Sequence, residues 1–242
     1  MNFSYESFGQ LIDRIVSAGY AFRRLDEARK TAVGERTFYL RHDVDISPRS
    51  ALRMGAISAG KGAPSSYFFQ LNAETYNIFR PDTLATMREL RSMGHCVGLH
   101  IDRGLFGDSE EAIANTMTWF SQTCAPLDRA VSFHRPAPDV LGRQYSSFQN
   151  AYAPNVFHPD RYAADSRRSL GFVSKVDDWL RGAVSPVQLL LHPEWWYPHD
   201  TVQNVWEDLR DRRQWELGSY AVENFRKVFG QVITPGKDRF GI

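Results

Sequence analysis

The sequence predicts an α/β fold with a parallel sheet, in a barrel-like or doubly wound arrangement. Short apolar runs typical of buried strands alternate with longer segments whose apolar residues recur at helical spacing. The chain has 242 residues, enough for one large α/β domain with a sizeable core. It shows no internal repeat, low-complexity block or linker, so we expect a single domain over residues 1–242.

Helix and strand patterns alternate most clearly in the first half of the chain. Apolar residues three and four positions apart predict helices over residues 4–19, 48–60, 81–93 and 108–120. Pro48 and Pro81 suit a first helical turn, and Gly19 and Gly94 suit the position after a last turn. Apolar runs predict strands over residues 36–40, 66–71, 96–100 and 129–133.

The second half of the chain is less regular. Residues 136–168 contain scattered Pro, Tyr, Asn and Ser, and we expect short strands and loops there. Two further strands are predicted over residues 172–176 and 187–191, followed by a long polar helix over residues 201–229. Parallel α/β folds place their sites at the carboxyl ends of the strands, so we expect the functional site at that edge of the sheet.

Composition and charge argue against several classes of protein. The formal net charge is +1, which gives no sign of a nucleic-acid partner. No apolar run approaches the ~18 residues of a membrane span. Two cysteines do not form a disulfide framework. The N-terminus lacks a basic segment followed by an apolar one, so we expect a cytoplasmic protein.

Acidic residues and histidines follow four of the predicted strands. Asp43 and Asp45 are two positions apart, so they point to the same side if the first strand continues. Like charges this close are unfavourable unless a metal, a proton or a base separates their roles. Later strand ends add further polar side chains, namely His100, Asp102, His134, Arg135, His192 and Glu194. Because aspartate and neutral histidine are ligands suited to Zn²⁺ and similar ions, the pattern predicts a divalent-metal site.

The order of these motifs resembles that of the polysaccharide deacetylase (NodB-homology) family. The matching segments are Asp-Val-Asp at 43–45, Gly-His-x-x-Gly-x-His at 94–100, His-Arg-Pro at 134–136 and Leu-Leu-His at 190–192. The first motif is most similar to the divergent branch of the family that has Asp-x-Asp. The resemblance extends from about residue 40 to residue 196, most of the chain.

The resemblance implies a fold, a cofactor and a reaction. The fold is a single-domain irregular (β/α) barrel of about seven strands. The cofactor is a divalent metal, usually zinc. The reaction is amide hydrolysis, here the N-deacetylation of an acetamido sugar or glycan precursor in surface polysaccharide biosynthesis. Because we expect a cytoplasmic protein, we expect its partner to be a carbohydrate or a nucleotide- or lipid-linked sugar and not finished cell-wall polymer.

The resemblance also implies roles for four residues. Asp43 corresponds to the catalytic base and Asp45 to the metal-binding carboxylate. His100 corresponds to the first metal histidine. His192 corresponds to the general acid that protonates the leaving nitrogen.

One position departs from the family pattern. The family's second metal histidine lies four residues after the first, where this chain has Gly104. We expect His134 to supply the third ligand instead, with Asp102 as the alternative. His134 occupies the place of a family arginine that braces the base, so we expect Arg135 to pair with Asp43 or Asp45.

Five residues around the predicted site are candidates for binding substrate, and each has a structural alternative. Asp102 and Glu194 lie at strand ends, Asp165 follows a tyrosine-containing segment, and Trp195 and Trp196 offer flat apolar faces for a sugar ring. Alternatively, Asp165 caps a turn, Glu194 faces water, and at least one tryptophan packs in the core.

Two other functions fit the same motifs. Members of the Asp-x-Asp branch include cyclic imidases and ureide hydrolases, so a small cyclic amide is the alternative substrate. A catalytically inactive metal- or sugar-binding homologue is the alternative outside enzymes, because the family's second histidine is missing. Bound metal would separate this last class from the first two most directly.

Overall fold

The structure is a computed structural model that describes residues 1–30, 34–107, 109–197 and 201–234. Backbone contacts divide the chain into two compact units, Met1–Asp200 and Thr201–Ile242. The single-domain organisation therefore stays a prediction. No helix in the described ranges is both long enough and apolar enough to cross a membrane.

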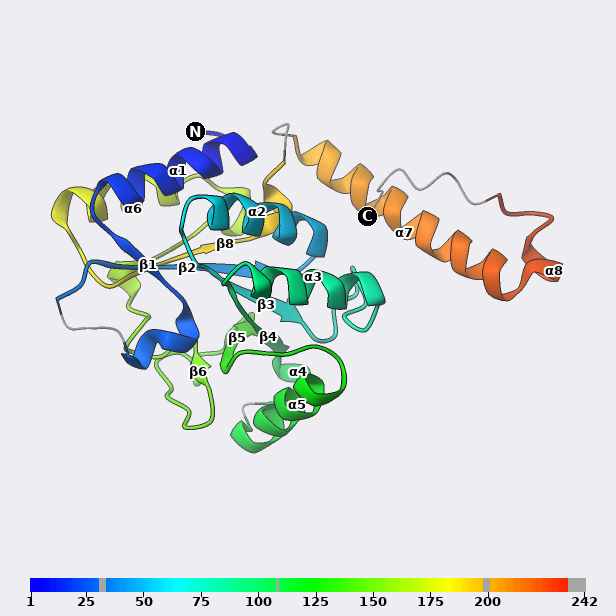
Figure 1. Cartoon of the computed structure of the whole chain (residues 1–242), viewed down its shortest axis with the longest axis horizontal. Coiled ribbons are helices and arrows are strands. Elements are labelled where there is room, and N and C mark those ends of the chain that lie inside the picture. The colour runs from blue at the N-terminus through cyan, green and yellow to red at the C-terminus, as the bar shows by residue number, and fades with distance from the viewer. Residues whose placement is uncertain (31–33, 108, 198–200, 235–242) are drawn as a thin grey trace. The chain divides into compact units, whose positions relative to one another are not determined.

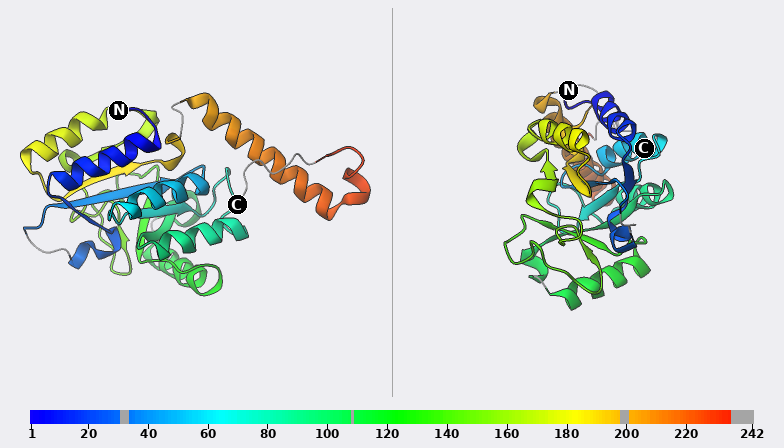
Figure 2. Two further views of the ribbon diagram at one scale, coloured as in Figure 1. Left: turned by 45° about the horizontal axis from the view of Figure 1, so that its top comes forward. Right: turned by 90° about the vertical axis from the view of Figure 1, so that its left-hand side faces the viewer.

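The first unit is built around a curled sheet in which every described strand pairing is parallel (Figure 1, Figure 2). The strand order is β6-β5-β4-β3-β2-β8-β7, and β1 pairs with the first half of β2. The strands are β1 (Ala21–Arg23), β2 (Thr37–Val44), β3 (Ser66–Gln70), β4 (Cys96–Asp102), β5 (Ala130–His134), β6 (Gln149–Asn150), β7 (Tyr162–Ala164) and β8 (Val187–Leu191). The predicted α/β class is confirmed, and the curled sheet is compatible with a (β/α) barrel.

The helices of the first unit begin where the sequence supplies caps. The side chains of Ser4, Ser47 and Ser109 each accept a hydrogen bond from the backbone N–H three residues further on. The helices are α1 (Tyr5–Ser17), α2 (Pro48–Gly60), α3 (Pro81–Ser92), α4 (Arg103–Phe106), α5 (Glu110–Thr123) and α6 (Phe172–Gly182). Short 3-10 turns are η1 (Leu25–Lys30), η2 (Pro159–Arg161), η3 (Ser166–Arg168) and η4 (Pro193–Trp195).

The first half of the chain follows the predicted order of elements. Its four helices and four strands match α1 to α3, α5 and β2 to β5, with ends that differ by a few residues. Asp108, the first residue of the fourth predicted helix, lies outside the described residues. The strand predicted over residues 187–191 is also confirmed, as β8.

The strand predicted over residues 172–176 is wrong, because this segment begins helix α6. Phe172, Val176 and Trp179 are the buried side chains of α6. Their spacing of four and three positions is helical, but the five residues of the predicted strand end before the second repeat. Strand β1 was missed, because three residues carry too little pattern.

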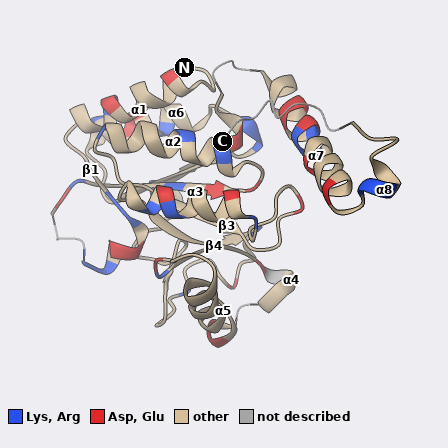
Figure 3. Ribbon diagram, turned by 45° about the vertical axis from the view of Figure 1, so that its right-hand side comes forward, with Lys and Arg blue, Asp and Glu red and all other residues tan. Residues whose placement is uncertain are grey.

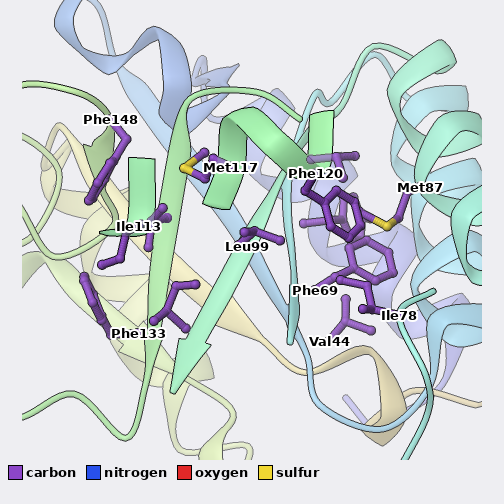
Figure 4. Packing of buried hydrophobic residues seen from close by; sticks show 14 of the residues in the cluster. Val44, Phe69, Ile78, Met87, Leu99, Ile113, Met117, Phe120, Phe133 and Phe148 are labelled. Carbon is purple, nitrogen blue, oxygen red and sulfur yellow. The ribbon is translucent and has the colours of Figure 1, made fainter. Parts of the chain in front are cut away.

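The two faces of the sheet have different surroundings. In β4, Val97, Leu99 and Ile101 join a buried apolar cluster with residues of α3 and α5, part of which Figure 4 shows. Cys96 lies in another cluster, with Phe68 and Ala130 among its members. This alternation is the two-residue period of a strand, and it sends His100 to the inner face, opposite the helices.

The second unit contains α7 (Val202–Asn224) and α8 (Arg226–Phe229). The helix predicted over residues 201–229 is therefore interrupted at Phe225, where the backbone is not helical. Acidic and basic residues are interspersed along α7, as the colours of the ribbon in Figure 3 show. This agrees with the polar helix expected from the sequence.

Candidate metal centre

The predicted site residues lie at the carboxyl edge of the sheet. His100 is within β4 and His134 is the last residue of β5. Asp45 follows β2, and His192 follows β8. Because the strands are parallel, their carboxyl ends meet at one edge. The sheet therefore brings together side chains that lie up to about 150 residues apart in the sequence.

Asp45, His100 and His134 have the arrangement of a metal-binding group. One ligand atom from each lies within 4.8 Å of the others. Nε2 of His100 is 3.3 Å from Oδ1 of Asp45, and this oxygen is buried without a hydrogen-bond partner among the described residues. A buried carboxylate oxygen beside two imidazoles fits a divalent cation, because the cation supplies the missing partner. These three residues are close enough to hold a metal ion, and they are the predicted ligands.

Asp102 is placed as a partner of His134. Oδ2 of Asp102 lies 3.4 Å from Nδ1 of His134, and Nε2 of Gln70 lies 3.4 Å from the same nitrogen. Asp102 is not part of the metal-binding group. Metal-ligating histidines commonly donate their other ring nitrogen to a carboxylate, and Asp102 is positioned for that contact. The geometry thus favours His134 over Asp102 as the third ligand.

Asp43 is paired with Arg41, and among the described residues no ion pair joins Arg135 to Asp43 or Asp45, the two partners expected for it. Nε of Arg41 donates to Oδ1 at 2.9 Å, and Nη2 donates to Oδ2 at 2.6 Å. Burial opposes the charge of Asp43, but Arg41 and His100 outweigh it and hold the pKa of the carboxyl well below its ordinary value. The sequence contained a signal for this pair, since residues i and i+2 of a strand share a face.

The Arg41 side chain is fully buried and has a complete set of partners. Besides Asp43, its nitrogens lie within hydrogen-bond distance of Oγ of Ser132 at 2.5 Å, the hydroxyl of Tyr152 at 2.8 Å and Oε1 of Gln188 at 3.3 Å. The two hydrogens of Nη2 therefore face three oxygens, those of Asp43, Ser132 and Tyr152. Its guanidinium also lies 4.4 Å from the ring centroid of Tyr152. A buried cation with this many acceptors is fixed in position, and it fixes Asp43 in turn.

Asp165 contacts the ring nitrogen of His192 that lies away from the metal-binding group. Oδ1 of Asp165 lies 2.7 Å from Nδ1 of His192, and Oδ2 accepts the indole N–H of Trp196 at 3.0 Å. Burial opposes the charge of the imidazolium, but the hydrogen bond and charge of Asp165 raise the pKa of His192 to about 9. Nε2 points the other way, 3.9 Å from Oδ2 of Asp45. A proton on Nε2 therefore faces the metal-binding group.

The predicted substrate-binding residues fall into two groups. Asp165 and Trp196 are fully buried, and Trp196 packs against Phe3 and Phe8, so neither is open to a substrate. Their expected role is corrected: Asp165 orients His192, and Trp196 belongs to the core. Trp195 is half-buried, with its ring centroid 6.4 Å from that of His192.

Glu194 is buried rather than facing water. Both of its carboxylate oxygens lack a hydrogen-bond partner among the described residues. Burial raises the pKa of Glu194 well above its ordinary value, and the nearby His192 offsets only part of this. Unlike Asp165, whose oxygens are occupied by His192 and Trp196, the buried carboxyl of Glu194 has hydrogen-bonding capacity left for a ligand or a water.

Two histidines outside the centre have structural roles. His42 alternates with Asp43 along β2, and its ring stacks on Tyr67 with a centroid distance of 4.4 Å. His95 accepts the backbone N–H of Ser65 at Nδ1, and Nε2 lies 3.0 Å from the carbonyl oxygen of Gly55. These contacts tie His42 to a neighbouring ring and His95 to the backbone, and neither residue belongs to the metal-binding group.

Comparison of the chain with models of known protein families gave no match, and comparison with curated proteins gave none. The resemblance to the polysaccharide deacetylase family therefore rests on the motifs alone.

Proposed function

We propose that the chain is a metal-dependent amide hydrolase that removes the acetyl group from an acetamido sugar or a glycan precursor. The observation that carries the proposal is that three groups of residues with different chemistry meet at one edge of the sheet. These are the group Asp45, His100 and His134, the Arg41-paired Asp43, and the Asp165-backed His192. Metal ligands, a carboxylate and a protonated imidazole are the parts that amide hydrolysis needs.

The metal-binding group is suited to a divalent ion such as Zn²⁺. Such an ion would polarise the amide carbonyl and lower the pKa of the attacking water. With two imidazoles and one carboxylate, the group has the three protein ligands of many catalytic zinc sites. One coordination position then stays open for substrate or water.

Asp43 is the group proposed to take the proton from the attacking water. Oδ2 already has Arg41 and Ser132 as neighbours, whereas Oδ1 has one donor among the described residues, Nε of Arg41. A carboxylate oxygen can accept two hydrogen bonds, so Oδ1 retains capacity for a water. Arg41 keeps the carboxylate ionised, which the role of base requires.

His192 is the group proposed to complete the reaction. Its Nε2–H gives a proton to the departing amine while the carbon–nitrogen bond breaks, and the water oxygen remains on the acetyl carbon as acetate. In the metal-free chain, the hydrogen bond and charge of Asp165 raise the pKa of His192 to about 9, which favours the protonated imidazole. Asp165 holds the ring so that Nε2 faces the centre.

The sugar is proposed from the surroundings of His192. Trp195 offers an apolar ring, and Glu194 offers a carboxyl with no partner among the described residues. An apolar face beside a polar group suits a sugar ring and its hydroxyls. An acetamido sugar, free or as part of a glycan precursor, is therefore the substrate class that we propose.

The test is to load the purified chain with Zn²⁺, Co²⁺ or Mn²⁺ and follow acetate release from acetamido-sugar nucleotides and oligosaccharides by NMR. We expect release that is lost in Asp45→Ala, His100→Ala and His192→Ala but retained in His158→Ala, whose side chain is exposed. Parallel reactions contain cyclic imides and ureides. Ring opening without acetate release would contradict the deacetylase, and absence of metal binding would contradict the hydrolase.

A further inference from the structure

Ser132 connects the proposed base to a proposed metal ligand. It lies in β5, in register with His100 of the neighbouring strand β4, and its side chain is fully buried. Three polar atoms surround its Oγ: Nη2 of Arg41 at 2.5 Å, Nδ1 of His100 at 2.8 Å, and Oδ2 of Asp43 at 3.2 Å. The hydroxyl thus contacts both the proposed base, Asp43, and a proposed metal ligand, His100.

The number of protons available determines the direction of each hydrogen bond. A guanidinium can only donate, and the carboxylate that it pairs with can only accept. The Ser132 hydroxyl has one hydrogen and two lone pairs. Nη2 of Arg41 has two hydrogens and three oxygens in reach, and we assign the hydrogens to the two shortest contacts, Ser132 at 2.5 Å and Asp43 at 2.6 Å. One lone pair of Ser132 then accepts from Arg41, and the hydroxyl hydrogen goes to Asp43. The second lone pair is left for His100, so Nδ1 of His100 must carry a proton.

Because Nδ1 carries a proton, a metal would bind the other ring nitrogen, Nε2. Nε2 of His100 is the atom that lies 3.3 Å from Oδ1 of Asp45, within the metal-binding group. In neutral imidazole one nitrogen donates and the other has a free lone pair, which is the form that binds metal. The hydrogen-bond directions at Ser132 therefore match the tautomer that the centre requires.

We infer that Ser132 is a positioning residue that holds His100 as the Nδ1–H tautomer, with Nε2 directed at the metal, and joins this ligand to Asp43. The inference rests on the metal centre of the proposed function. Removing such an outer partner costs about 10–100-fold in metal affinity or activity in known sites. Ser132 would act only through His100 and Asp43, since its oxygen has no contact with the metal-binding group other than Nδ1 of His100.

The test measures zinc affinity by competition with a chelator. We expect Ser132→Ala to bind zinc about 10–100-fold more weakly than the unchanged chain. Ser132→Thr, which keeps the hydroxyl, should recover most of the loss. Ser58→Ala is the matched control, because Ser58 is also fully buried and its hydroxyl donates to a backbone carbonyl at 2.8 Å, outside the centre. Equal affinity of Ser132→Ala and the unchanged chain would overturn the inference.

A second measurement needs no variant. In the unchanged chain with ¹⁵N-labelled histidine, we expect the NMR signals of His100 to show a proton on Nδ1, both without metal and with zinc. An unprotonated Nδ1, or zinc coordinated at Nδ1, would overturn the inference even if Ser132→Ala does not fold. If the unchanged chain binds no zinc, the proposed function fails, and the metal-free spectrum still decides the tautomer.

Discussion

Asp43 and Asp45 are two residues apart, yet their surroundings give them different tasks. Asp43 is neutralised by the protein itself, through two hydrogen bonds from Arg41. Asp45 has no such partner among the described residues, and its buried Oδ1 faces His100. Like charges this close need separate stabilisation. Arg41 supplies it for Asp43, and a cation at the metal-binding group would supply it for Asp45.

Replacing Asp43 changes stability as well as chemistry. Asp43→Asn keeps the shape but leaves the buried charge of Arg41 without its partner, so we expect the free energy of unfolding to fall by about 3–5 kcal/mol. Arg41→Met removes the other charge. The two changes together should cost about 0.5–3 kcal/mol less than the sum of the single changes, because the double variant buries no unpaired charge.

Urea unfolding of the four proteins in this double-mutant cycle checks the expectation. Purely additive costs would mean that the ion pair contributes no coupling. The cycle also serves the activity test, since loss of acetate release in Asp43→Asn supports the role of base only where the variant is folded.

The Asp165–His192 pair gives a prediction for pH. The pKa of His192 in the folded chain is raised to about 9 from an ordinary value of 6.5. The pair therefore stabilises the fold fully below about pH 6.5, and this contribution is lost as the pH rises through about 9. In Asp165→Asn, burial acts without its partner, so we expect the midpoint to fall to 6.5 or lower.

NMR titration of His192 in the metal-free chain measures both midpoints. The metal-free form is required, because a cation beside Asp45 would lower the pKa of the imidazole. A midpoint near 6.5 in the unchanged chain would show that Asp165 does not raise the pKa of His192.

The sequence contained most of the site but not the contacts that support it. Asp45, His100 and His134 were predicted from their positions after strands, which depend only on the order of elements. Arg41 lies two residues before Asp43 in the same strand, so the sequence pattern could have identified it as the partner of Asp43. The contacts of Asp165 with His192 and Trp196 could not, because they depend on how β7 and β8 pair.

At the scale of elements, β4 and β5 approach closely because of Gly98. A Cβ on this residue would lie 2.2 Å from the carbonyl oxygen of Ala130 and 3.0 Å from the ring of Phe68. No ordinary contact is that short, so a side chain here must push the two strands apart or displace the ring. His100 and Ser132 lie in register on these same strands.

We therefore expect Gly98→Ala to destabilise the chain by about 1–3 kcal/mol, the usual cost of overpacking. It should also weaken zinc binding, because the strands carry His100 and His134. Gly60→Ala in α2 is the control, since a Cβ there meets nothing within 4 Å. Thermal unfolding and chelator competition measure the two effects, and an unchanged melting temperature in Gly98→Ala would contradict the expected clash.

The success of prediction at this scale depended on segment length. Helices of three turns and strands of five or more residues repeat their pattern often enough to be recognised. The segment at 172–176 was misassigned because its helical repeat continues to Trp179, beyond the apolar run. Strands β6 and β7 have two and three residues, and they owe their extended form to their neighbours in the sheet.

At the scale of the whole molecule, every residue of the proposed site belongs to the unit Met1–Asp200, and so do the described apolar clusters. A compact unit with its own core is expected to fold alone. We therefore predict that a chain ending at residue 200 unfolds cooperatively and binds zinc within about threefold of the complete chain, since ~0.65 kcal/mol or less then separates the two affinities. Calorimetry of both chains gives the melting transitions, and chelator competition gives the affinities. The same truncation with His100→Ala is the negative control for binding.

A truncated chain that does not fold would support the single domain predicted over residues 1–242. A truncated chain that folds but loses zinc would show that the second unit contributes to the centre, contrary to the ligand set inferred here.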